Sequence, residues 1–270
     1  MPAPDRIADI LDADHRLLCA AVREAGALAL SYFGSDVAHW KKAGDSPVSE
    51  ADLAVDRLLH DQLLTARPDY GWLSEETADD RRRLACRDVF IIDPIDGTRA
   101  FLKGKPHFTV CAALVRDGRP VAAAVYNPAL DQFFDAIAGG GSRLNGAPIR
   151  VSSRAALPGC RMASHAPMFK HPAWSLPWPD MEVIERNSVA YRLALVASGE
   201  VDAALALSGK SDWDIAAAEL IVAEAGGTFT RHDGRAFVYN GDSTRHPSVM
   251  AANPALHAKL LERVGALNIS

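Results

Sequence analysis

The amino-acid sequence predicts an α+β protein. Apolar residues at helical spacing open the chain, short apolar runs separated by turn residues follow, and helices alternate with strands towards the end. The 270 residues, 49% of them hydrophobic, suffice for a large core. We expect two halves, 1–155 and 156–270, divided near the segment 158–179, which is rich in Pro, Trp and His.

Two helices are predicted at the start of the chain. Apolar residues recur at helical spacing over 7–33. A polar loop, 41–47, separates this helix from the next. Ser49 and Asp52 fit a capping-box pattern, so a second helix is expected to begin at Ser49.

The segments on either side of residue 75 differ in character. Residues 72–74 are predicted to form a short strand. The following segment, 77–87, is charged, and we interpret it as a solvated excursion without chemistry.

The stretch 89–101 is the part of the sequence most suggestive of chemistry. Its apolar beginning indicates a strand that stops at Asp93, because the following proline cannot donate a ladder hydrogen bond. A turn at Asp96 and Gly97 then leads into a helix that begins at Thr98. Two carboxylates at such a corner can hold a divalent cation beside backbone N–H groups that bind phosphate. Taken singly, each of these residues has a structural alternative. Asp96 could cap the helix, Asp93 could be a polar strand end, and Gly97 could be a turn residue.

The middle of the chain is expected to be an antiparallel meander. Strand-like runs over 108–115, 120–126 and 132–137 are separated by turn residues. The glycines at 139–141 lack the downstream Lys-Ser/Thr of a phosphate-binding loop, so we interpret them as a hairpin turn. The last third is expected to contain helices over 188–197, 211–225 and 254–264 and strands over 201–207 and 249–252.

Three further acids lie at junctions between predicted elements. Asp52 and Asp214 stand in the first turns of helices, and Glu75 ends a strand. Each has a structural alternative, since the two helix residues complete capping-box patterns and Glu75 could belong to a solvated acidic pair. Together with the two acids of the 89–101 stretch, they supply the oxygen ligands that a hard cation such as Mg²⁺ requires.

Composition limits the compartment and the partners of the protein. The net charge of −5 and the absence of a long basic run argue against a nucleic-acid polymer as partner. The N-terminus does not resemble a signal peptide, and charged residues interrupt the apolar segment 193–207, so no membrane span is predicted. Four widely separated cysteines are expected to be reduced thiols in a cytoplasmic protein.

Three motifs together resemble the inositol monophosphatase superfamily of Mg²⁺-dependent, lithium-sensitive phosphatases. They are Trp72-Leu73-Ser74-Glu75-Glu76, Asp93-Pro94-Ile95-Asp96-Gly97-Thr98, and Trp213-Asp214-Ile215-Ala216-Ala217 with Glu224-Ala225-Gly226-Gly227. The resemblance spans nearly the whole chain. It implies a layered α-β-α-β-α sandwich, with a mostly antiparallel sheet first and a smaller mixed sheet later.

The resemblance also implies a set of metal ligands. Glu75, Asp93 and the carbonyl of Ile95 would hold one Mg²⁺, and Asp93, Asp96 and Asp214 a second. A third, weaker ion would lie near Glu75, ligated mostly by water. Lithium is expected to inhibit by replacing one of these ions.

The same resemblance implies catalytic roles for Asp52, Thr98 and Glu75. The Thr98 hydroxyl, paired with Asp52, would orient or deprotonate the attacking water, whose pKa the metal held by Glu75 lowers. Backbone N–H groups of Gly97 and Thr98 would bind phosphate oxygens. The reaction would be an in-line transfer to water without a phospho-enzyme.

Substrate choice in this superfamily depends on the far side of the pocket. Inositol monophosphatases and many histidinol phosphatases place a Glu seven residues before the acid that corresponds to Asp214, but here that residue is Leu207, which cannot accept a hydrogen bond. Arg192 falls where bisphosphate nucleotidases tend to carry a basic residue that could bind a second phosphate. Two further residues are candidates for binding the substrate. Tyr191 could place its ring beside a nucleotide base, and Lys210 could bind the second phosphate. The expected substrate, a small phosphorylated metabolite, is 3'-phosphoadenosine 5'-phosphate, followed by inositol 1-phosphate and then histidinol phosphate.

Other interpretations remain open at this point. Haloacid-dehalogenase-type phosphatases also carry an Asp at a strand end, but one residue separates their two acids, whereas two separate Asp93 from Asp96. A metal-stabilised regulatory or RNA-associated protein is the non-enzymatic alternative. His107 is expected to be a structural residue, with a place in the lining of the pocket as the alternative. Trp174 and Trp178 are expected to serve packing or an interface. The resemblance favours a homodimer.

Overall fold

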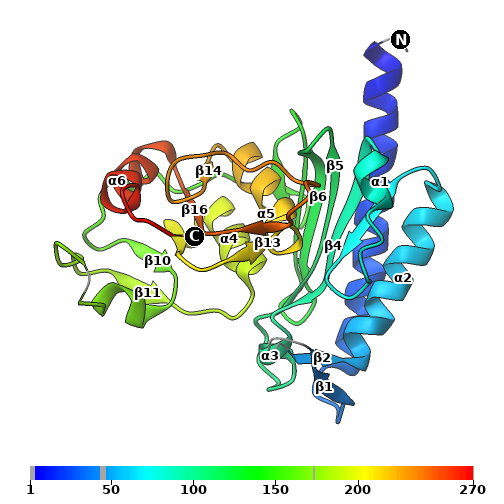
Figure 1. Ribbon diagram of the computed structural model, residues 1–270, viewed down its shortest axis with the longest axis horizontal. Coiled ribbons are helices and arrows are strands. Elements are labelled where there is room, and N and C mark those ends of the chain that lie inside the picture. Colours follow the sequence, from blue (N-terminus) through cyan, green and yellow to red (C-terminus); the bar gives the residue numbers. More distant parts are fainter. Residues whose placement is uncertain (1–3, 43–46, 173, 270) are drawn as a thin grey trace.

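The helices and strands of the chain form five successive layers, α-β-α-β-α (Figure 1). The structure is a computed structural model that describes residues 4–42, 47–172 and 174–269, with side chains from residue 9 onward. The fold class inferred from the sequence is therefore confirmed. The predicted loop 41–47 lies partly outside the described residues, and the division of the chain at 155/156 stays a prediction.

Helices make up the first, third and fifth layers. In Figure 1 they run from α1 and α2 at one end, through α4 and α5 in the middle, to α6 at the other. The bounds are α1 (Pro4–Tyr32), α2 (Glu50–Ala66), α3 (Thr98–Phe101), α4 (Val189–Ala197), α5 (Asp212–Glu224) and α6 (Pro254–Val264), with short 3-10 helices η1 (Arg82–Ala85) and η2 (Ala166–Lys170).

Two sheets make up the second and fourth layers. The seven-stranded sheet contains, in spatial order, β3 (Gly71–Ser74), β4 (Asp88–Asp96), β5 (Thr109–Arg116), β6 (Arg119–Asn127), β7 (Gln132–Ile137), β8 (Ser142–Leu144) and β9 (Ala147–Pro148). The five-stranded sheet contains β11 (Glu182–Ile184), β10 (Arg161–Ala163), β12 (Ala203–Ala206), β16 (Val249–Ala252) and β14 (Thr228–Thr230). Two small pairs complete the set, β1 (His39–Lys41) with β2 (Pro47–Ser49) and β13 (Lys210–Ser211) with β15 (Arg245–His246).

Strand direction differs between the two sheets. In the larger sheet β3 runs parallel to β4, and the other described neighbours are antiparallel. In the smaller sheet β10 is parallel to both β11 and β12, whereas β16 is antiparallel to β12 and β14. The meander and the later mixed sheet are thus confirmed. The predicted strand 132–137 has the same bounds as β7.

Side chains of the strands contribute to three hydrophobic cores, one on each side of the larger sheet and one beneath α6. Phe90 and Ile92 of β4 pack towards α1 and α2, whereas Val89 and Ile91 pack towards α4 and α5. The third core lies on the face of the smaller sheet that is turned away from α4 and α5, where Leu205 of β12 packs under α6. Because both faces of these strands are buried, their sequences contain nearly continuous apolar runs instead of alternating ones.

The strand β4 continues past the point where the sequence predicts its end. It runs through Pro94 to Asp96, so the predicted stop at Asp93 is wrong. Asp93 lies opposite Cys111 of β5 and Asp96 opposite Thr109, so three steps on β4 match two on β5. This is a one-residue bulge, and a bulge tolerates a proline because its extra residue takes no part in the ladder.

The segment 77–87 is not merely a solvated excursion, contrary to the prediction. Arg83 of η1 is 2% exposed, and its guanidinium donates to both carboxylate oxygens of Asp79, at 3.0 and 2.8 Å. It also donates to the Asn240 side-chain oxygen over 2.8 Å. A buried arginine therefore joins this segment to the far end of the chain.

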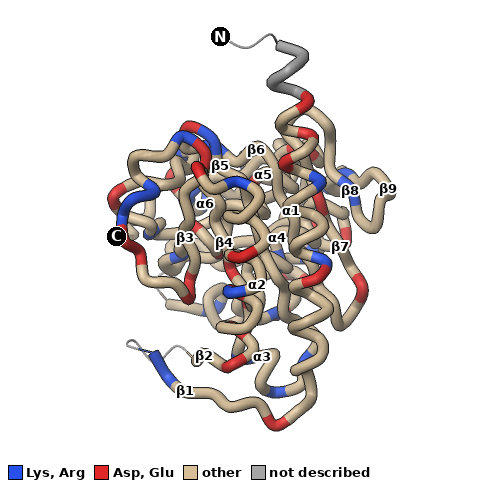
Figure 2. The backbone as a smooth tube through the Cα atoms, turned by 90° about the vertical axis from the view of Figure 1, so that its right-hand side faces the viewer, with Lys and Arg blue, Asp and Glu red and all other residues tan. Residues whose placement is uncertain are grey.

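Other properties of the described residues agree with the sequence analysis. The predicted capping box at the start of α2 is formed by Ser49 and Asp52. The four cysteines are free thiols. None of the described helices is both long and apolar enough to cross a bilayer. Acidic and basic residues are mixed along α1 and α2 (Figure 2).

Candidate active site

The bulge in β4 determines where its two acids point. In a regular strand, residues three apart face opposite sides of the sheet. Here Cys111, the partner of Asp93, packs in the core beside α5, whereas Ile95 packs in the core beside α1. The extra residue thus reverses the alternation, and Asp96 faces the same side as Asp93.

Two carboxylates of β4 meet a third, from α5, on that side. One oxygen each of Asp93, Asp96 and Asp214 lies within 4.8 Å of the other two. Asp214, in the first turn of α5, also accepts the backbone N–H of Ser211 over 2.7 Å. Asp96 accepts the Ser188 hydroxyl over 2.7 Å at the start of α4. The cluster therefore lies where β4 meets the N-termini of two buried helices.

Without a bound cation, the buried carboxylates of this cluster repel one another. Burial, followed by the neighbouring acids, raises the pKa of Asp93 well above its usual range. Burial and then Asp214 raise the pKa of Asp96 to about 7, and burial raises that of Asp214 to about 6. The buried Oδ1 of Asp93 has no hydrogen-bond partner among the described residues. A divalent cation would offset this repulsion and satisfy the unpaired oxygen, so the cluster fits a metal.

Glu75 approaches the same pocket from the end of β3. Its Oε1 accepts from the Nζ of Lys42 over 3.1 Å, and Lys42 also donates to Glu76 over 2.6 Å. Lys42 precedes β2, and sequence analysis missed it because no motif or spacing marks it. The lysine offsets part of the negative charge on this side of the pocket.

Thr98 and Asp52 lie beside the acidic cluster. The Thr98 Oγ1 is 3.1 Å from Asp52 Oδ1 and 3.1 Å from the carbonyl oxygen of Ile95, so its single proton can be donated to either. Asp52 is 1% exposed and accepts from both the backbone N–H and the hydroxyl of Ser49. The capping box that begins α2 thereby also holds a carboxylate next to the pocket.

Gly97 provides the corner between β4 and α3. Its φ of 100° lies in the left-handed region, and a Cβ there would come within 2.8 Å of the His107 carbonyl oxygen. Only glycine therefore fits without displacing the neighbouring backbone.

A pocket of about 220 Å³ contains most of the predicted site. Its described lining consists of Pro47, Glu75, Asp93, Ile95, Asp96, Gly97, Thr98, Arg99, Asn187 and Asp214. All the predicted metal ligands and both predicted phosphate-binding residues are thus brought together. Their roles stay predictions.

A second, larger cleft adjoins this pocket. It measures about 490 Å³, and its described lining consists of Lys105, His107, Ser164, His165, Glu185, Arg186, Asn187 and Arg192. Asn187 lines both spaces and so marks where they meet. His107 lines this cleft, as the alternative to a structural role had it, and its role stays a prediction. Sequence analysis missed Asn187 because a lone asparagine before a helix cap carries no distinctive signal.

The other two predicted substrate residues lie elsewhere. Tyr191 is 2% exposed, and its hydroxyl donates to Gln132 over 2.6 Å, so it is a core residue and lines neither space. Lys210 is also buried, and its Nζ donates to the carbonyl oxygens of Ser208 and Gly209. Both substrate assignments are corrected on these grounds, because burial and existing partners leave neither group facing a ligand.

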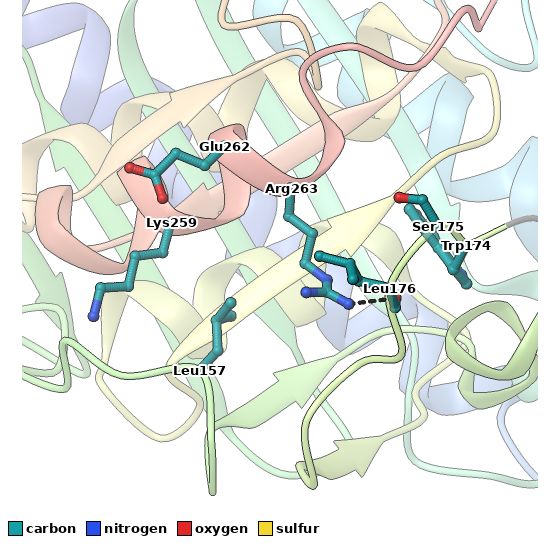
Figure 3. A pocket seen from close by; sticks show the side chains of 7 residues that line it. All are labelled: Leu157, Trp174, Ser175, Leu176, Lys259, Glu262 and Arg263. Carbon is teal, nitrogen blue, oxygen red and sulfur yellow. Dashed lines mark hydrogen bonds between the residues drawn. The ribbon is translucent and has the colours of Figure 1, made fainter.

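A third pocket, of about 370 Å³, lies on the opposite side of the smaller sheet, at α6. Its described lining consists of Leu157, Trp174, Ser175, Leu176, Lys259, Glu262 and Arg263. Figure 3 shows Arg263 reaching from α6 to the Leu176 carbonyl oxygen, to which it donates over 2.6 Å. Trp174 packs edge-to-face on Trp178 at 5.2 Å, so their predicted packing role is confirmed. Glu262 is the one carboxylate in the described lining of this third pocket, and a single carboxylate does not form a metal cluster. The acidic pocket is therefore the candidate active site.

Comparison with known proteins agrees with the fold and the acidic site. The model of the inositol monophosphatase family matches residues 11–268. An inositol-1-monophosphatase of Mesorhizobium japonicum is 36% identical over 80% of this chain and 82% of its own length. A histidinol-phosphatase of Chlorobaculum parvum is 30% identical over 93% of this chain and 96% of its own. The crystal structure of the Bartonella henselae extragenic suppressor protein SuhB superposes with a TM-score of 0.79 at 31% identity, covering 93% of this chain and 98% of that one.

The chain belongs to the inositol monophosphatase family. It is a phosphoric monoester hydrolase, and the family as a whole is generally metal-dependent. The haloacid-dehalogenase alternative is therefore wrong.

Proposed function

We propose that the chain is a Mg²⁺-dependent phosphatase for a small substrate with two phosphates, and that it converts 3'-phosphoadenosine 5'-phosphate to AMP. The observation that supports this proposal is the basic cleft that meets the acidic pocket at Asn187. The acidic pocket suits metal ions and the phosphate to be cleaved, and the basic cleft suits a second anionic group of the substrate.

The acidic pocket would hold two to three Mg²⁺ ions. The ligands would be Glu75, Asp93, the carbonyl oxygen of Ile95, Asp96 and Asp214. Bound Mg²⁺ would lower the pKa of the attacking water and neutralise negative charge on the phosphate ester. The contribution of the chain itself is to hold these oxygens on one side of the sheet.

Thr98 and Asp52 would handle the proton of the attacking water. The Thr98 hydroxyl, aligned by Asp52 over 3.1 Å, accepts a hydrogen bond from that water. Burial raises the pKa of Asp52, which makes its carboxylate a better proton acceptor. As the water oxygen bonds to phosphorus, its proton would pass through the Thr98 hydroxyl to Asp52, the ester P–O bond would break, and the leaving oxygen would take a proton from solvent. Backbone N–H groups of Gly97 and Thr98 would orient the phosphate.

The second phosphate would bind in the basic cleft. Lys105, Arg186 and Arg192 line it, and Glu185 is the one acid in its described lining. Desolvation and the nearby cations Arg186 and Lys105 lower the pKa of His107, which indicates a positive potential there. A guanidinium such as that of Arg192 can bind a phosphate through two parallel hydrogen bonds.

Inositol 1-phosphate is the second candidate substrate, followed by histidinol phosphate. Relatives that carry the names of both activities support these alternatives. The residue at position 207 argues against them, because Leu207 is half-buried against the core under α6 and has no acceptor for a substrate hydroxyl or amine.

A phosphate-release panel tests the proposal. The substrates are 3'-phosphoadenosine 5'-phosphate, inositol 1-phosphate, histidinol phosphate and fructose 1,6-bisphosphate, each assayed with Mg²⁺. We expect the nucleotide to have the highest kcat/KM, and Arg192→Gln to lower it by about tenfold or more while sparing inositol phosphate. Arg87→Gln, an exposed arginine paired with Asp117, is the control. A preference for inositol phosphate would refute the assignment, and no release from any substrate would favour a regulatory role.

Three further expectations stay predictions within this proposal. Lithium should inhibit in competition with Mg²⁺, sedimentation should find a homodimer, and cell fractionation should find the protein in the cytoplasm. We expect no nucleic-acid polymer as partner.

A further inference from the structure

A second cluster of metal-binding side chains lies outside the active site. It consists of His15 and Cys19 on α1 and Asp135 on β7. One ligand atom of each lies within 4.8 Å of the other two. In Figure 2, β7 runs beside α1 on the face turned towards the viewer. The active-site proposal uses none of these residues.

The fold brings the three side chains together from two directions. His15 and Cys19 are four residues apart, so they project from the same face of α1. Asp135 lies within β7, opposite Ala124 of β6 and Arg143 of β8. Helix α1 packs on this sheet, and the strand therefore presents the carboxylate to the helix face that carries the other two groups.

The distances suit a tetrahedral zinc ion. His15 Nε2 lies 3.3 Å from Cys19 Sγ and 3.2 Å from Asp135 Oδ2. Bonds of about 2.0 Å to nitrogen and oxygen and about 2.3 Å to sulfur put such ligand atoms about 3.3 to 3.5 Å apart in a tetrahedron. His15 Nε2 would need to move by only a few tenths of an ångström from each of these two partners to admit the ion, and Cys19 and Asp135 lie within 4.8 Å of each other.

Charge and access also suit a soft divalent cation. A carboxylate and a thiolate together would balance the charge of Zn²⁺. The side chains of His15 and Asp135 are 14% and 10% exposed, so the cluster reaches solvent. Arg143 Nη1 stands 3.7 Å from Asp135 Oδ2 and would compete with the ion, but its side chain is 40% exposed and free to turn away.

We propose that His15, Cys19 and Asp135 bind one Zn²⁺, with a water molecule as the fourth ligand. The ion would tie the long helix α1 to the middle of the seven-stranded sheet and so stabilise the outer layer. Sulfur and imidazole ligands favour zinc over the Mg²⁺ that suits the all-oxygen active site. The two sites would therefore select different metals from the same solution.

Cobalt absorption tests this proposal directly. Chelator-treated protein is returned to excess Mg²⁺, which occupies the acidic pocket, and is then titrated with Co²⁺. We expect one equivalent to produce a sulfur-to-cobalt charge-transfer band that Zn²⁺ abolishes. Cys19→Ser should remove the band, whereas Cys86→Ser, which alters another half-buried thiol, should retain it. A band that survives Cys19→Ser, or no band at all, would overturn the proposal.

Thermal unfolding in Mg²⁺ provides a second readout. Zn²⁺ should raise the Tm of the wild type, but not that of Cys19→Ser or His15→Gln, and zinc affinity should fall by about tenfold or more in both. Arg143→Gln should tighten binding, because a competing cation is removed. Phosphatase activity in Mg²⁺ should be unchanged in all three variants. An equal zinc-induced shift in the wild type and in His15→Gln would contradict the proposed site, even if Cys19→Ser failed to fold.

Discussion

The hydroxyl of Thr98 donates to the carboxylate of Asp52 over 3.1 Å, although 46 residues separate the two in the chain. The bond joins the start of α3 to the first turn of α2 at the rim of the acidic pocket. Asp52 is held in turn by Ser49, with contacts of 2.8 and 2.5 Å. A capping box therefore orients the hydroxyl that we assign to the attacking water.

Thr98→Val should lower kcat by about 10²- to 10⁴-fold, because it removes the hydroxyl but keeps the shape of the side chain. Steady-state kinetics with Mg²⁺ and the nucleotide substrate measure the effect. Thr77→Val is a matched control, since Thr77 Oγ1 also donates to a carboxylate of α2, that of Asp56, over 2.6 Å. Thr77→Val should lower the free energy of unfolding by about 1 kcal/mol and leave the phosphatase activity unchanged. Equal losses of activity in the two variants would contradict the assigned role.

Asp93→Asn should separate catalysis from stability. The change removes a buried charge at constant volume, so phosphatase activity should fall by at least about 10²-fold. The metal-free protein should nevertheless become more stable, by on the order of 1 kcal/mol, because the repulsion within the cluster is relieved. Urea unfolding in chelator measures this gain. Asp88→Asn, at the other end of β4 and paired with Arg116, should keep full activity. Loss of the fold in Asp93→Asn would contradict the catalytic interpretation.

The stability of the metal-free protein should fall as pH rises from about 4 to about 7. The pKa of Asp96 is about 7 in the folded chain and near 4 in an unfolded one, so in this window the folded state binds more protons. Raising the pH therefore favours unfolding, until both states are ionised above about pH 7. Mg²⁺ added near neutral pH should restore the lost stability, and Asp96→Asn should flatten the profile. Stability that rises with pH in chelator would refute this view of the cluster.

Arg83→Met should destabilise the protein by about 1 to 3 kcal/mol, because it leaves the half-buried Asp79 and the Asn240 side chain without their buried partner. The neighbouring Arg82→Met is a close control, since the Arg82 side chain is 89% exposed and its partner Asp80 is 53% exposed. That change should cost less than about 1 kcal/mol. Chemical denaturation of both variants measures the difference, and equal midpoints would contradict the anchoring role of Arg83.

Much of the fold could be predicted from the sequence because its signals are local. Ser49 with Asp52 marks the start of α2, and the run 132–137 has the bounds of its strand. Most acids of the active site were also recognisable, since Asp52 and Asp214 stand where a helix begins and Glu75 and Asp96 where a strand ends. Helix caps and strand periodicity depend on neighbouring residues only, so sequence alone determines them.

The arrangement of the site was decided by tertiary contacts. Nothing local shows that β4 continues through Pro94 with a bulge, because pairing with β5 stabilises that conformation. Yet this bulge puts Asp93 and Asp96 on one side of the sheet, towards the helix that carries Asp214. The burial of Tyr191 likewise follows from packing across layers. Sequence determined which oxygen ligands the protein possesses, and the tertiary structure decided that they meet, because convergence depends on strand register and layer packing between residues far apart in the chain.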